Sequence, residues 1–188
     1  MKIPQKYSIA NLPTPIQKVD FRGRSFLVKR DDFTGSELTG NKVRKLEYLL
    51  YHAVKNKNDY IFTCGGDQSN HCRATVIAAN KFGLKTKLFL WGKENKNPDG
   101  NLFLNQMAGA EFKFLSKKDY QNVNNIMQVE AEELERNGKK TLVIPTGGST
   151  PIGVWGYINC VEEIKKQLKP NKIGGILSAA GSGGTSAG

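Results

Sequence analysis

Lys42 is the residue of this sequence with the clearest potential for covalent chemistry. It follows a glycine-containing turn over 39–41, and from Val43 onward the apolar residues recur at helical spacing. The free backbone N–H groups at a helix start disfavour an ammonium group, and burial does the same. A lysine in such surroundings is a nucleophile that can form a Schiff base near neutral pH. The alternative is an ordinary solvated lysine on a basic helix face.

A second group of polar residues follows a predicted buried strand over 59–64. A glycine pair ends that strand, and Gln68, Ser69 and Asn70 then stand at the start of the next predicted helix. Ligands of parallel sheets collect beyond the carboxyl ends of the strands, and helix N-termini bind anions. We therefore expect Gln68, Ser69 and Asn70 to bind the carboxylate of a substrate. The alternative is that Ser69 or Asn70 only caps the helix.

A third candidate is the glycine-rich segment GSGGT over 181–185. Its successive backbone amides and its hydroxyl groups suit a phosphate. It lacks the Gly-Lys-Ser/Thr ending of a Walker loop, and Ser186 stands where a dinucleotide-binding G-x-G-x-x-G motif needs its last glycine. The residues predicted to hold the phosphate are Gly181, Ser182, Gly183, Gly184 and Thr185. An amine nucleophile, a carboxylate site and a phosphate site together predict a pocket for pyridoxal phosphate and an amino acid.

The elements that must position these residues alternate between strands and helices, which favours an α/β fold with a parallel sheet. The predicted strands cover 24–29, 59–64, 85–91, 111–115, 141–145 and 173–179. The predicted helices cover 42–56, 70–82, 101–108, 119–137 and 152–168. In this arrangement each candidate site lies in a turn or at the start of a helix.

The chain of 188 residues carries 28 Lys+Arg against 17 Asp+Glu, a formal net charge of +11. A basic balance of this size could indicate nucleic-acid binding. The lysines are scattered, however, and aromatic residues are not interleaved with them. Scattered charge serves solubility and attracts anionic ligands in general. We therefore expect no nucleic-acid partner.

The cysteines Cys64, Cys72 and Cys160 are odd in number and show no C-x-x-C spacing, and there are 2 histidines. This pattern is typical of reduced thiols rather than of a disulfide framework, and we expect no metal site. No apolar run approaches the roughly 18–20 residues that cross a membrane. The first residues lack the apolar centre of a signal peptide. We therefore expect a cytoplasmic protein without a membrane partner.

Five motifs in a fixed order resemble those of one enzyme family. They are KRDD over 29–32, GNKVRKLE over 40–47, QSNH over 68–71, IPTGGS over 144–149 and GSGGT over 181–185. Over essentially its whole length the chain is similar to the 1-aminocyclopropane-1-carboxylate deaminase / D-cysteine desulfhydrase family of fold-type II pyridoxal-phosphate enzymes. The first two motifs are the most specific part of the resemblance.

The resemblance implies a role for each candidate residue. Lys42 would be the Schiff-base lysine and a catalytic base, Asn70 would contact the ring oxygen of the cofactor, and Ser69 would bind the substrate carboxylate or take part in proton transfer. The segment 181–185 would hold the cofactor phosphate. For Lys45, on the same helix as Lys42, we expect pairing with an acid such as Glu47 or with solvent.

The fold implied by the resemblance is a three-layer lobe with an open parallel sheet, of the tryptophan synthase beta-like kind, plus an incomplete second lobe. Residues 1–45 would be the N-terminal part of a large cofactor domain, and 46–150 a small α/β domain. Residues 151–188 would begin the return to the large domain and end in the phosphate loop. Family members are considerably longer, so this sequence corresponds to their N-terminal part.

The function implied is a pyridoxal-phosphate-dependent lyase that deaminates a small amino acid, acting as a homodimer. The sequence GGS over 147–149 and the later Gly156-Tyr157 favour D-cysteine desulfhydrase, which forms pyruvate, hydrogen sulfide and ammonia. One alternative is 1-aminocyclopropane-1-carboxylate deaminase. Another is a truncated, non-catalytic remnant of such an enzyme. A third is an unrelated phosphate- or nucleotide-binding module.

Overall fold

The computed structural model describes residues 3–168 and 173–188 and is built on a parallel sheet of four strands. The order of the strands across the sheet is β5-β4-β3-β6. Helices connect consecutive strands, as parallel pairing requires. The four strands are β3 (Tyr60–Gly66), β4 (Lys85–Trp91), β5 (Glu111–Leu115) and β6 (Thr141–Ile144).

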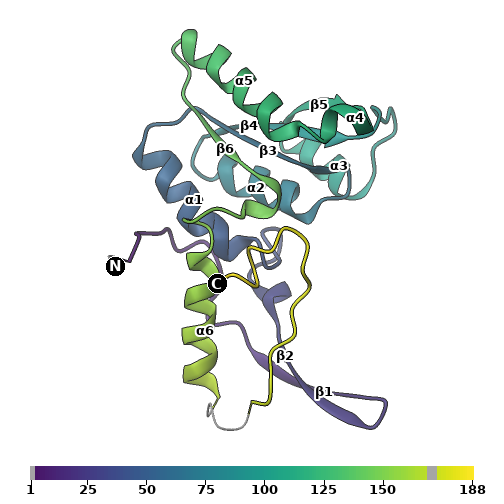
Figure 1. The fold of residues 1–188 in the computed structure, drawn as a ribbon, viewed down its shortest axis with the longest axis vertical. Helices are drawn as coiled ribbons and strands as arrows, with labels where there is room; N and C mark the ends of the chain where they lie inside the picture. The colour runs from purple at the N-terminus through teal and green to yellow at the C-terminus, as the bar shows by residue number, and fades with distance from the viewer. Residues whose placement is uncertain (1–2, 169–172) are drawn as a thin grey trace.

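Helices cover both faces of this sheet, which makes a three-layer α/β/α arrangement (Figure 1). One face packs against α1 (Val43–Lys55), α2 (Asn70–Asn80) and α3 (Gly100–Met107). The opposite face packs against α5 (Val123–Arg136), which the short α4 (Lys117–Tyr120) precedes. The predicted α/β fold with a parallel sheet is therefore confirmed.

The alternation of side chains along β3 explains how one strand serves two layers. Ile61 is fully buried among apolar side chains of α1 and α2. Its neighbour Phe62 points to the other face, where it packs with Phe89 and with Met127 of α5. Both faces of this central strand are thus apolar, as in parallel sheets covered on both sides.

A second group of elements lies on the α1 side of the sheet (Figure 1). The helix α6 (Trp155–Gln167) packs against α1, and β1 (Ile16–Phe21) pairs with β2 (Arg24–Lys29) in an antiparallel hairpin. The segment 173–188 runs back past β2 and α6 towards the start of α1. This segment brings the glycine-rich turn close to Lys42.

Three predictions of secondary structure need correction. The strand β1 was not predicted, because both faces of the hairpin are exposed and its sequence carries no one-sided apolar pattern. The predicted helix over 119–137 is two helices, since Asn122 leaves helical geometry at φ −109° and ψ 22°. The predicted strand over 173–179 is wrong: it pairs with no strand that the structure describes, and a strand needs such a partner.

The predicted domain boundary at 45/46 falls inside α1, which runs without interruption from the turn at 39–42. Within the described ranges, no helix has both the length and the apolar character needed to cross a membrane.

Candidate functional site

A cavity of about 270 Å³ lies where the start of α1, the start of α2 and the glycine-rich turn meet. Seven of the residues singled out in the sequence line it, from segments far apart along the chain. They are Lys42, Ser69, Asn70, Gly181, Ser182, Gly183 and Thr185. His71, Thr146, Gly147 and Ala179 complete its lining. Among these described residues Lys42 alone has an ordinarily charged side chain, so the cavity favours anionic ligands.

Lys42 is half-buried and occupies the position just before the first residue of α1. Gly40 makes the turn before it with φ at +105°, a conformation that glycine adopts without strain. Burial lowers the pKa of the Lys42 ammonium. Its Nζ donates to Asn41 Oδ1 at 2.9 Å. The amine that was predicted to be a nucleophile therefore lies in a partly desolvated cavity, with an amide rather than a carboxylate as its partner.

The glycine-rich turn is held next to this lysine by two contacts. Asn41 Nδ2 lies 3.4 Å from Thr185 Oγ1, and the hydroxyl groups of Ser149 and Ser182 lie 2.7 Å apart. Within the turn, the backbone N–H groups of Ser186 and Ala187 both donate to the carbonyl oxygen of Gly183 at 3.0 Å. Gly181, Ser182, Gly183 and Thr185 of this turn thus line the same cavity as Lys42 and the start of α2.

Lys45 is buried, with 1% of its surface exposed, and the expectation that it pairs with Glu47 or solvent is wrong. Its Nζ donates to the carbonyl oxygen of Gly147 at 3.2 Å and lies 3.5 Å from Ser149 Oγ. Glu47 instead binds Lys6 and the backbone N–H groups of 9–10. Burial, and then the charge of Lys42, lowers the pKa of Lys45 to about 8.

Lys45 also lies against the glycine-rich turn. A side chain at Gly184 would place its Cβ 2.8 Å from Lys45 Nζ and 2.2 Å from Ser149 Oγ. A glycine is needed at this position, and the buried ammonium stands behind the turn predicted to bind phosphate. Gly184 itself is not part of the cavity lining.

The start of α2 presents Ser69 and Asn70 to the cavity. Ser69 is the cap of this helix, since its Oγ accepts from the backbone N–H of Cys72 at 3.2 Å. The exposed Asn70 accepts from Asn101 Nδ2 through its Oδ1 at 3.0 Å. The capping role weighed as the alternative is real, and it leaves Ser69 at the edge of the cavity.

Gln68 was predicted to bind substrate, but its side chain points elsewhere. Its Oε1 accepts from the backbone N–H of Asn101 at 2.9 Å, and its Nε2 donates to Asp99 Oδ1 at 3.1 Å. The structure thus does not place Gln68 in the lining, although it places both of its successors there.

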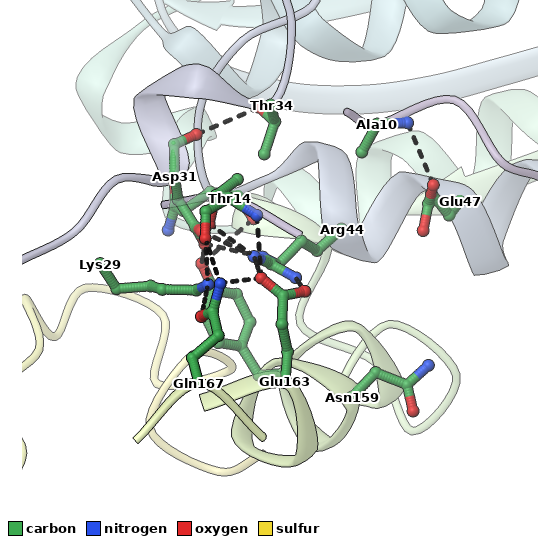
Figure 2. Close-up of polar contacts among 12 residues, drawn as sticks. Ala10, Thr14, Lys29, Asp31, Thr34, Arg44, Glu47, Asn159, Glu163 and Gln167 are labelled. Atoms are coloured by element: carbon green, nitrogen blue, oxygen red, sulfur yellow. Dashed lines mark hydrogen bonds and ion pairs between the residues drawn. The ribbon is translucent and has the colours of Figure 1, made fainter. Parts of the chain in front are cut away.

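Arg44, two residues after Lys42, lies in a cluster of charged side chains that holds the start of α1 in place (Figure 2). Arg44 Nε and Nη2 each lie 2.9 Å from an oxygen of Asp31, and Nη1 lies 3.0 Å from Glu163 Oε2. Lys29 also binds Glu163, and Tyr157 Oη donates to Asp31 Oδ2 at 2.8 Å. The positive charges of two cations therefore match the negative charges of two carboxylates at the place where α1, α6 and β2 meet.

Close packing of backbones adds to this cluster. At Gly156 of α6 a Cβ would lie 2.5 Å from the carbonyl oxygen of Arg44 and 2.8 Å from the backbone nitrogen of Lys45. The helices α1 and α6 therefore touch through their main chains at the turn that carries both lysines. Burial and the adjacent Asp31 charge raise the pKa of Tyr157, whose hydroxyl group stays protonated in this contact.

The sequence assigned no role in the site to two residues near Lys42, namely Lys45 and His71. Lys45 shares a helix face with Lys42, since the two are three residues apart, but this spacing does not reveal its burial. His71 follows Asn70 in the first turn of α2, lines the cavity and is almost completely buried. Burial, then the charges of Lys42 and Lys45, lowers the pKa of His71 to about 3, so the imidazole is neutral at physiological pH.

Comparisons with known proteins agree with this geometry. The chain is 44% identical over 197 residues to the bifunctional D-cysteine desulfhydrase/1-aminocyclopropane-1-carboxylate deaminase, mitochondrial, of Arabidopsis thaliana, covering 97% of this chain and 49% of that protein. It is 45% identical over 180 residues to a putative 1-aminocyclopropane-1-carboxylate deaminase of Thermotoga maritima, covering 94% of this chain and 57% of that protein. The crystal structure of an ACC deaminase homologue matches with a TM-score of 0.87 at 42% identity, over 98% of this chain and 57% of that one.

The chain thus spans about half the length of the relatives it matches. A family model described as "Pyridoxal-phosphate dependent enzyme" matches residues 7–188, which include the cavity and all the elements around it. The cofactor predicted from the three candidate sites is therefore that of the family. This chain belongs to the family of pyridoxal-phosphate dependent enzymes.

Proposed function

We propose that the protein is a lyase that removes the amino group of a small amino acid, with Lys42 as its catalytic lysine. The observation that carries this proposal is the meeting of Lys42, the start of α2 and the 181–185 turn at one cavity. Each of the three provides one group that the reaction needs: an amine, a carboxylate site and a phosphate site.

The residues present fit pyridoxal phosphate. Lys42 offers a partly desolvated amine, and the buried Lys45 has no carboxylate partner among the described residues, which leaves its charge for a phosphate. Gly184 lacks the Cβ that would collide with Lys45 and Ser149. When bound, the cofactor supplies an aldehyde for the amine and a ring that accepts electrons from the substrate. We propose that 181–185 and Lys45 hold its phosphate, and that Asn70 contacts its ring oxygen.

The substrate carboxylate would bind at the start of α2. Backbone N–H groups and the dipole of a helix N-terminus favour an anion there. We propose Ser69 and Asn70 as its direct contacts. Gln68 would reach the substrate only by releasing Asp99 and Asn101.

The freed amine of Lys42 would take the proton from the substrate α-carbon. A base with a pKa near the working pH is the most effective, and burial moves the pKa of Lys42 in that direction. Ser69 Oγ, at the cavity edge, is the proposed partner for proton transfer. With D-cysteine and water as substrates, loss of the thiol and hydrolysis would give pyruvate, hydrogen sulfide and ammonia.

D-cysteine is our preferred substrate and 1-aminocyclopropane-1-carboxylate the second candidate. The Arabidopsis relative carries both activities in its name, and the Thermotoga relative is named for the second. The sequence GGS over 147–149 and Gly156-Tyr157 favour the first. Assays of the protein loaded with pyridoxal phosphate against both compounds decide between them. Formation of hydrogen sulfide from D-cysteine, and its loss in Lys42→Ala, would support the proposal. If neither compound is turned over, the result favours the alternative of a truncated, non-catalytic remnant.

The arrangement of the whole enzyme is also a proposal. Residues 1–45 and 151–188 would belong to one cofactor-binding lobe, and 46–150 to a smaller lobe. The contacts of α6 with Arg44 and Lys29 support the first grouping. We further propose a cytoplasmic homodimer, which size measurements and fractionation of cells test directly.

A further inference from the structure

His71 carries an unused hydrogen-bonding nitrogen beside the catalytic candidate. It follows Asn70 in the first turn of α2, lines the cavity and is 5% exposed. Its Nε2 lies 2.9 Å from Thr63 Oγ1 on the central strand. Its Nδ1 is buried and has no hydrogen-bond partner among the residues that the structure describes. Buried polar atoms are rarely left unpaired, so this nitrogen calls for an explanation.

The partners of Thr63 determine which nitrogen of His71 bears the hydrogen. Thr63 Oγ1 donates its single hydrogen to the carbonyl oxygen of Ile144 at 2.8 Å. It can therefore only accept from His71, and Nε2 must be the donor. Because the imidazole is neutral, Nδ1 then carries a lone pair and can only accept. The two hydrogen bonds that link Ile144, Thr63 and His71 thus leave Nδ1 as a buried acceptor.

The charged groups close enough to influence this ring are two lysine side chains. The charge of Lys42 acts on His71 most strongly and that of Lys45 second, and both residues lie at the start of α1. Lys45 Nζ already donates to Gly147, whereas among the described residues Lys42 Nζ has only the side chain of Asn41 as its acceptor. Neither β3 nor the 146–148 turn brings a charged side chain to the ring among the described residues.

The space between Lys42 and His71 is bordered by two glycines. A Cβ at Gly147 would lie 3.4 Å from Lys42 Cε, and one at Gly148 would lie 3.6 Å from His71 Cε1. Both glycines have positive φ, at +69° and +64°. Gly147 and Gly148 thus add no side chain next to the amine or the imidazole.

We infer that His71 is a positioning residue for Lys42, whose Nζ donates a hydrogen to His71 Nδ1 when the lysine turns from Asn41 into the cavity. The lysine then has two alternative acceptors, one at the edge of the cavity and one inside it. The inner acceptor orients the amine while it is not covalently bound. No proton moves to the imidazole, because its low pKa keeps it neutral. The inference rests on the proposed role of Lys42, but its test requires no cofactor.

The state of His71 is measurable by ¹⁵N NMR of the histidine side chains. The chain has 2 histidines, His52 and His71, and His52→Gln assigns their signals. The inference predicts a hydrogen on Nε2 and none on Nδ1 at neutral pH. A hydrogen on Nδ1, alone or on both nitrogens, would overturn it.

A matched pair of amide variants tests the link to Lys42. His71→Asn keeps a polar atom near the position of Nδ1, and His71→Gln keeps one near Nε2 and its contact with Thr63. The readout is the pH midpoint for reductive methylation of Lys42, followed by peptide mass spectrometry with the exposed Lys139 as reference. An acceptor stabilises the ammonium, so His71→Gln should lower this midpoint by about 0.7 unit while His71→Asn leaves it in place. If His71 acts only through its contact with Thr63, His71→Asn should shift the midpoint and His71→Gln should leave it in place. That result contradicts the inference, and so does an unchanged midpoint in both variants.

Discussion

Arg44 and Asp31 form a two-point ion pair in which both nitrogen–oxygen distances are 2.9 Å (Figure 2). The guanidinium is 1% exposed and the carboxylate 12% exposed. Arg44 lies two residues beyond Lys42, so the pair ties the start of α1 to the segment after β2. Its geometry therefore bears directly on where the Lys42 amine lies.

Removing the charge of Asp31 should destabilise the fold. Asp31→Asn leaves the buried Arg44 facing one carboxylate fewer, and breaking a buried pair costs about 3–5 kcal/mol. The neighbouring Asp32 is exposed and pairs with Arg30 at the surface, so Asp32→Asn should change little. Urea unfolding of the two variants provides the measurement. Equal losses would show that the pair does not hold the helix start.

Gly156→Ala should push α6 away from α1. The added methyl group would meet the main chain of Arg44 at 2.5–2.6 Å, and a backbone contact of this kind yields less readily than a side chain. Overpacking typically costs about 1–3 kcal/mol. Gly174→Ala is the control, because its Cβ would meet nothing within 4 Å. Thermal unfolding distinguishes them, and two identical melting curves would refute the close crossing.

Lys45 should make stability rise with pH in the alkaline range. Its pKa is about 8 in the fold against the ordinary value of 10.5, so between these values the unfolded chain binds the extra proton. The free energy of unfolding then increases with pH over this window, by up to about 3 kcal/mol. Lys45→Met removes this contribution, and the difference between the two curves isolates it from other titrating groups. If the difference in free energy of unfolding between the two proteins stays constant from pH 7 to 10, burial does not lower the pKa of Lys45.

Substitutions of Ser69 separate helix capping from substrate binding. Aspartate and asparagine both cap helices well, so Ser69→Asp and Ser69→Asn should keep stability within about 1 kcal/mol of the original. Only aspartate adds a negative charge where the substrate carboxylate is proposed to bind. We expect a much larger rise in KM for Ser69→Asp than for Ser69→Asn. Equal KM values in the two variants would show that the substrate carboxylate does not bind at Ser69.

Much of the sheet could be predicted from the sequence. The strands β4 and β5 have the predicted bounds, because β4 is a mostly buried apolar run, β5 alternates exposed with more buried residues, and glycine or turn residues mark their ends. The hairpin strand β1 could not be found, since its stability comes from pairing with β2 and its turn at Arg22-Gly23 rather than from burial. The segment 173–179 has a strand-like pattern without a partner, which sequence alone does not reveal.

The residues of the candidate site also fall into those that local sequence patterns predict and those that they do not. Local patterns placed Lys42, Ser69 and the 181–185 turn, because each depends on a turn next to a helix start or on glycine content. The burial of Lys45 and His71 depends on packing against the 146–148 turn, more than seventy positions further along the chain. Such long-range contacts leave no local pattern. Gln68 is the opposite case, since the side chain of this polar residue beside the site accepts a hydrogen bond from the start of α3.

The central claim is that the amine of Lys42 binds the cofactor, and reductive trapping tests it most directly. The protein is mixed with pyridoxal phosphate, reduced with borohydride and mapped by peptide mass spectrometry. The account predicts the added mass on Lys42, and its loss in Lys42→Arg but not in Lys139→Arg. Cofactor found on Lys45 or spread over exposed lysines, with Lys42 unmodified, would contradict the account.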